Sequence, residues 1–137
     1  MNQVFLTKKQ VIELIKEYFH KHGDKDVEVN IILELSSNTS GIGTYEKTED
    51  DIIITFEVTK TEEINNTIIK TICNLQLEDL NEIFKSYEHQ EGFEYDSFLY
   101  VGGIRHVGYF VDEDTPIFEG ILLNYREKSL KKKLKMF

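Results

Sequence analysis

Two histidines and two carboxylates stand within seven residues at 20–26, in the order His-Lys-His-Gly-Asp-Lys-Asp. Imidazole and carboxylate side chains bind divalent transition metals, so this segment is the first candidate for metal chemistry. Residues two apart do not share a face of a helix, however, and no H-E-x-x-H or Cys/His spacing accompanies them. A histidine in the last turn of a helix interacts favourably with the helix C-terminus. We therefore predict neither a metal nor any other cofactor.

Cys73 is the only cysteine of the chain and its strongest nucleophile. A cysteine hydrolase needs a histidine base, and His89 and His106 are the candidates. Cys73 alternates with Ile69 and Leu75 on the apolar side of a β-rich segment, where a cysteine acts as a small buried hydrophobe. No serine lies in a G-x-S-x-G pattern either. The prediction is a protein without catalytic activity.

Acidic side chains outnumber all other reactive types, with 25 Asp and Glu against 16 Lys and Arg and a net charge of -9. Eighteen of the acids, against five basic residues, lie between Thr44 and Glu119. Such a surface repels nucleic acid and anionic membranes and attracts basic proteins, over a screening length of about 8 Å at physiological salt. A solvated face that keeps the protein soluble is the alternative. The predicted acidic binding face comprises Glu46, Glu49, Asp50, Asp51, Glu62, Glu63, Asp112, Glu113 and Asp114.

A second candidate surface is rich in aromatic residues around one arginine. Tyr, Phe and Arg are enriched at the hot spots of protein interfaces. The predicted contact residues are Tyr95, Tyr100, Arg105 and Tyr109. Gly102-Gly103 lacks the Gly-Lys-Ser/Thr ending of a phosphate loop, and it joins two β-rich runs, so it predicts the turn of a hairpin. Alternation along these strands also assigns about half of the aromatic side chains to the core.

The N-terminal segment predicts a helix from about Lys8 to His22. Thr7 and Gln10 form a capping box, and Leu6 and Val11 occupy the positions of a hydrophobic staple. An apolar stripe at helical spacing follows, and Gly23 supplies a left-handed stop.

After this helix the apolar period changes to two, which predicts antiparallel strands. The fold class is α+β, a single domain over 1–137 with one curved antiparallel sheet in the order α-ββββ-α-βββ-α, packed by helices on one face. The expected strands are 27–35, 44–48, 52–59, 67–77, 93–101, 104–111 and 117–125, with helices at 77–87 and 126–137.

The last twelve residues reverse the charge of the chain, since Arg126 to Phe137 carry six basic residues and one acid. This end could dock on the acidic surface of its own chain or of a second copy, contact nucleic acid or a membrane, or stay solvated. The first interpretation is preferred because opposite charge is near at hand. Pairing of two copies is left open.

Several absences favour a cytoplasmic setting. A single cysteine permits no intrachain disulfide, the N-terminus lacks the layout of a signal peptide, and no run of about 18 apolar residues is present. The abundance of Ile, Asn, Lys and Glu points to an AT-rich bacterial or phage genome.

The predicted order of elements in a small acidic chain is similar to that of secretion chaperones and immunity-type α+β domains. The likeness is one of architecture, covers no motif and carries no residue over. The expected function is a binding module that blocks or escorts a basic partner, as an immunity protein or antitoxin blocks a toxin. Two alternatives stay open: a phage-encoded DNA-mimic inhibitor of a host defence or nucleic-acid enzyme, and a small enzyme or ligand-binding protein with a pocket between sheet and helix.

Overall fold

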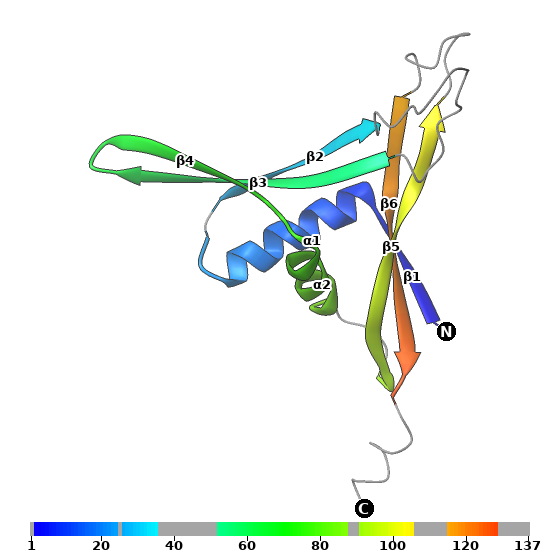
Figure 1. Ribbon diagram of the computed structural model, residues 1–137. Coiled ribbons are helices and arrows are strands. Elements are labelled where there is room, and N and C mark those ends of the chain that lie inside the picture. The colour runs from blue at the N-terminus through cyan, green and yellow to red at the C-terminus, as the bar shows by residue number, and fades with distance from the viewer. Residues whose placement is uncertain (1, 25, 36–51, 88–90, 106–114, 129–137) are drawn as a thin grey trace, which may run out of the picture.

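Two helices and two antiparallel sheets of three strands each make up an α+β fold (Figure 1). A computed structural model describes residues 2–24, 26–35, 52–87, 91–105 and 115–128. The first sheet has the order β1–β6–β5, formed by Asn2–Thr7, Thr115–Glu127 and Phe93–Arg105. The second has the order β2–β3–β4, formed by Val27–Leu35, Ile52–Ile64 and Thr67–Asn74. Helices α1 (Lys8–Lys21) and α2 (Leu77–Lys85) lie in the angle between the sheets.

Helix α1 confirms the prediction made from its caps. The backbone N–H of Gln10 donates to Thr7 Oγ1 at 3.3 Å, and the backbone N–H of Thr7 donates to Gln10 Oε1 at 2.8 Å. Leu6 and Val11, at the staple positions, are both buried. The helix ends at Lys21, and Gly23 adopts a φ of +96°, as a left-handed stop requires.

One core joins the two sheets and both helices. The ring of Phe56 on β3 packs edge-on against Phe118 of β6, with centroids 5.9 Å apart, and stacks at 6.2 Å on Tyr100 of β5. Phe84 of α2 meets Phe98 of β5 at 4.9 Å. The buried ring of Phe56 therefore joins the two sheets, and the buried ring of Phe84 joins α2 to β5.

The order of elements differs from the predicted one. A strand, β1, precedes α1 and pairs with β6 at the other end of the chain. The sequence analysis used these six residues only as the segment that leads into the helix. It did not predict a strand there, because the pairing strand lies more than a hundred residues away. The strands also form two sheets and not one curved sheet. The predicted strand at 44–48 and helix at 126–137 lie wholly or largely outside the described residues.

The prediction of a hairpin turn at Gly102-Gly103 is wrong, because β5 continues through both glycines to Arg105. Gly102 pairs with Phe118 and Gly103 with Ile117, and neither glycine has a positive φ. The register shifts between Val101 and Gly102, as at a β-bulge. A Cβ on Gly102 would lie 2.1 Å from the carbonyl oxygen of Ile117, so this glycine permits a close approach of two strands.

The tight turn with positive φ lies instead at Asn65 and Asn66, with φ values of 52° and 64°. It joins β3 to β4 as a two-residue hairpin. Asparagine is the residue after glycine that tolerates this conformation best, so the Asn-Asn pair was the available signal for the turn.

We expect Gly102→Ala to lower the free energy of unfolding by about 1–3 kcal/mol, because the added methyl group meets backbone that cannot move aside cheaply. Gly103→Ala is the matched control, since no atom lies within 4 Å of a Cβ built there. Its effect should stay within about 0.5 kcal/mol. Urea unfolding followed by circular dichroism measures both. Equal destabilisation by the two variants would contradict the close approach described above.

Candidate functional site

One face of the β1–β6–β5 sheet points away from both helices (Figure 1). This face exposes a row of apolar side chains. Phe5, Leu122 and Leu99 lie side by side across the three strands, because Leu122 is the register partner of both neighbours. Phe5 is 45% exposed and Leu99 56% exposed. The ring of Phe5 lies over Gly120, where a Cβ would come within 2.9 Å of it. The absence of a side chain at Gly120 therefore leaves room for the Phe5 ring and for the close backbone of Leu6.

A polar row runs parallel to the apolar one. Gln3 Nε2 donates to Asn124 Oδ1 at 2.8 Å, and Asn124 Nδ2 donates to Ser97 Oγ at 3.2 Å. Asn124 is only 6% exposed, and these bonds satisfy its amide. We call the two rows together the open face: Phe5, Leu122, Leu99, Gln3, Asn124 and Ser97.

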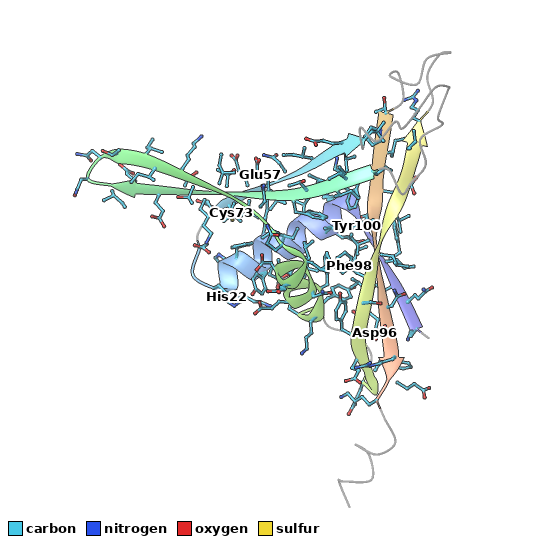
Figure 2. The ribbon with its side chains drawn as sticks, in the orientation of Figure 1. His22, Glu57, Cys73, Asp96, Phe98 and Tyr100 are labelled. Atoms are coloured by element: carbon cyan, nitrogen blue, oxygen red, sulfur yellow. The ribbon has the colours of Figure 1, made fainter. Side chains whose placement is uncertain are left out.

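A charged group closes one end of the open face. The strand pairing jumps from Tyr95 to Ser97, so Asp96 is an extra residue at a β-bulge (Figure 2). Its carboxylate accepts from Ser97 Oγ at 3.2 Å and lies 3.4 Å from Arg126 Nη1. Arg126 Nε also lies 3.1 Å from Glu94 Oε1. The first basic residue of the C-terminal region is thus paired with acids of its own chain, while residues 129–137 lie outside the described residues.

The β3–β4 hairpin extends away from the helices as an arm, which we define as residues 59–74 (Figure 1). All eight residues of β4 are exposed. Cys73 is among them, which corrects the prediction of a buried small hydrophobe. β4 is the edge strand of its sheet, and all of its residues are exposed. Nothing in the described part of the chain therefore covers the face on which the apolar alternation places the thiol.

The predicted acidic binding face lies mostly outside the described residues: Glu46, Glu49, Asp50, Asp51, Asp112, Glu113 and Asp114. Glu62 and Glu63 are exposed on the arm, about 33 Å along β3 from Ile52. Strands β3 and β6, which follow Asp51 and Asp114 in the sequence, begin at the same end of the molecule, because Phe56 packs on Phe118 near their starts. Glu62 and Glu63 therefore stand apart from that end.

The predicted aromatic surface is divided between core and solvent. Tyr95, Tyr100 and Arg105 all lie on the single strand β5, and Tyr109 lies outside the described residues. Tyr95 reaches the second helix, where its hydroxyl donates to Asn81 Oδ1 at 2.6 Å. Tyr100 is 44% exposed beside Phe98 (Figure 2). Arg105, the last residue of β5, is exposed. Only Tyr100 and Arg105 are thus free to meet a partner with much of their side chains.

A groove of about 480 Å³ lies between the second half of α1 and Ser86 and Tyr87, the two residues that follow α2. Its lining includes Tyr18, His22 and Tyr87 together with the ion pair Glu17–Lys21, whose charged atoms are 3.2 Å apart. The His22 ring lies 4.3 Å from that of Tyr18, and its Nδ1 is 2.8 Å from the Tyr18 carbonyl oxygen. The histidine thus engages the helix C-terminus, as predicted for this segment. The groove lies between helices, whereas the pocket considered from the sequence lay between sheet and helix.

Within the described ranges, no three His, Cys, Asp or Glu side chains gather as a metal would require. None of the described helices is long and apolar enough to cross a membrane. Comparisons of the chain with protein-family models, with curated proteins and with solved structures find no match.

Two tyrosines behind the open face predict a loss of stability in alkali. Burial raises the pKa of Tyr125 to about 12, with a smaller contribution from Tyr87. The pKa of Tyr95 is also raised to about 12, mainly by burial and to a smaller extent by the nearby Tyr125 and Asp96. The folded state thus holds protons that the unfolded chain releases near pH 10, so stability present below that pH falls as pH rises towards 12.

The test compares urea unfolding midpoints at about pH 9 and about pH 11. The wild-type midpoint should fall, and Tyr125→Phe should reduce the fall because phenylalanine has no proton to lose. Tyr95→Phe tests the second site and also removes the hydrogen bond to Asn81. An equal alkaline fall in the wild type and in both variants would contradict the assignment to these two hydroxyls.

Proposed function

We propose that the protein is a binding module without catalytic activity that recognises a basic protein and blocks or escorts it, as immunity-type inhibitors do. The observation that carries the proposal is the open face, on which an apolar row of Phe5, Leu122 and Leu99 lies beside a hydrogen-bonded polar row. An apolar centre with satisfied polar groups around it is the usual anatomy of a protein interface.

The side chains of the open face are largely ordered before a partner binds, which lowers the entropic cost of binding. These side chains stand on a paired sheet, and Asn124 is held from both sides. A partner therefore orders few groups that were free beforehand, and little of the binding free energy is spent on ordering them. Large half-exposed side chains such as Phe5 supply contact area with few rotatable bonds.

Charge selects the class of partner. The chain carries -9 overall, and two acidic groups, Glu49 to Asp51 and Asp112 to Asp114, directly precede β3 and β6 in the sequence. These strands begin at the same end of the molecule. Acids concentrated there would steer a positively charged protein towards the body, which raises the association rate more than the final affinity.

We expect Leu99→Lys to weaken partner binding at least about tenfold, because it replaces the most exposed side chain of the apolar row, 56% exposed, by a charged one. Ile53→Lys is the control: it makes the same kind of change at a residue that is 49% exposed on the other sheet. The full-length protein is immobilised, proteins from the source cell are captured, and their amounts are measured by mass spectrometry. Captured proteins should be basic and should be lost with Leu99→Lys alone. Equal capture by both variants would contradict the role of the open face.

A second set of variants tests the charge. Replacing Glu49, Asp50, Asp51, Asp112, Glu113 and Asp114 by their amides should weaken capture and flatten its dependence on salt. The control neutralises six exposed acids elsewhere, namely Glu13, Glu17, Asp26, Glu28, Glu34 and Glu78. If the first set binds as the wild type does at every salt concentration, charge does not select the partner.

The groove between the helices supports a second candidate function, the binding of a small molecule. Its volume of about 480 Å³ lies in the range of ligand pockets, and aromatic rings form part of its wall. A thermal-shift screen with a metabolite library tests this, because a ligand that binds the folded state raises the melting temperature. Tyr87→Ala should remove the shift, whereas Tyr100→Ala, outside the groove, should keep it. A library without any stabilising compound would count against this candidate.

A further inference from the structure

The arm ends its sheet with an edge strand, β4, and among the described residues no strand pairs with its outer side. Its sequence is Thr-Ile-Ile-Lys-Thr-Ile-Cys-Asn, in which Lys70 is the sole charge. Four isoleucines of the arm are at least 43% exposed: Ile64, Ile68, Ile69 and Ile72. A long exposed edge with β-branched apolar residues is a template for a further strand.

We propose that β4 pairs antiparallel with β4 of a second copy of this chain, so that the two three-stranded sheets join into one continuous sheet. This inference goes beyond the proposed function, because it concerns the arm and not the open face. It requires only backbone hydrogen bonding along two identical edges and contact between the isoleucines that flank them.

Charge favours a second copy over the basic partner at this position. The arm contains Lys60 and Lys70 against Glu62 and Glu63, so its net charge is zero within a chain of -9. A basic protein gains no attraction from a neutral strand, whereas a second acidic molecule meets least repulsion there. The arm is thus the part of the surface suited to self-association.

Symmetry restricts the register of the pair. A two-fold axis perpendicular to the sheet keeps each side chain on its own face, so residues of β4 pair with residues an even number of positions away. The axis must therefore pass midway between the two copies of one residue, which we call the residue on the axis. An axis through Lys70 would set two lysines directly opposite each other, which is unfavourable. An axis through Ile69 or Thr71 instead pairs Lys70 with Ile68 or Ile72 of the second copy.

The first experiment measures the mass of the isolated full-length protein by sedimentation equilibrium over a range of concentrations. The wild type should approach twice its 16.1 kDa. The double variant Ile69→Lys and Ile72→Lys should raise the dissociation constant at least about tenfold, because each substitution acts twice across the axis. Ile53→Lys, an exposed isoleucine on the central strand β3, should leave it unchanged. A wild type that stays monomeric at all concentrations overturns the proposal.

Disulfide trapping tests the pairing in protein with an otherwise native edge. In a Cys73→Ser background, Ile69→Cys and Thr71→Cys are oxidised separately. Residues on the axis lie about 4.5–5.5 Å apart between Cα atoms, which suits a disulfide. A residue two positions from the axis is four residues along the strand from its copy, about 14 Å away, which is too far for a disulfide. One of the two variants should therefore form a covalent dimer and the other should not.

Ile53→Cys in the same background is the control and should stay monomeric, since it is exposed but not at an edge. Cross-linking of Ile53→Cys as fast as of the β4 variants, or of neither β4 variant, overturns the proposal. None of these measurements uses the basic partner, so failure here leaves the tests of the open face unaffected, and the reverse also holds.

Discussion

The ring of Phe56 connects the two sheets, and the exposed surfaces of the protein follow from that contact. It lies between Phe118 of β6 and Tyr100 of β5, with centroid distances of 5.9 and 6.2 Å, and is almost fully enclosed. The angle it sets between the sheets leaves room for both helices on the inner side. The opposite side of the β1–β6–β5 sheet is consequently the open face.

The same contact decides where the other surfaces lie. β3 is anchored near its start at Phe56, so its last residues extend past the helices and carry β4 with them into the arm. The starts of β3 and β6 lie together at the other end. The open face and the neutral edge of β4 thereby lie on different parts of one small molecule. This separation would allow a basic partner and a second copy to bind without competing.

Local sequence signals predicted the elements whose stabilising groups are neighbours in the chain. The capping box of Thr7 and Gln10 and the apolar stripe after it specify α1, and alternation specifies β2. β1 had no local signal of this kind, because its partner β6 lies at the far end of the chain. Gly102 was misassigned for a related reason. A glycine required by a close contact with Ile117 has the same appearance in sequence as a glycine required by a turn.

The sequence by itself determined the net charge, the α+β class, both described helices and most of the β-rich segments, because composition and period are local properties. The candidate site could be predicted only in part: the acids are visible as a composition, but the open face is not. Phe5, Leu122 and Leu99 are three apolar residues in separate segments, and only strand pairing aligns them. Likewise, only the tertiary structure decided that Cys73 is exposed, since burial depends on what covers a strand. The alignment of the open face and the exposure of Cys73 both depend on contacts, or their absence, between residues distant in the chain, which local sequence patterns do not reveal.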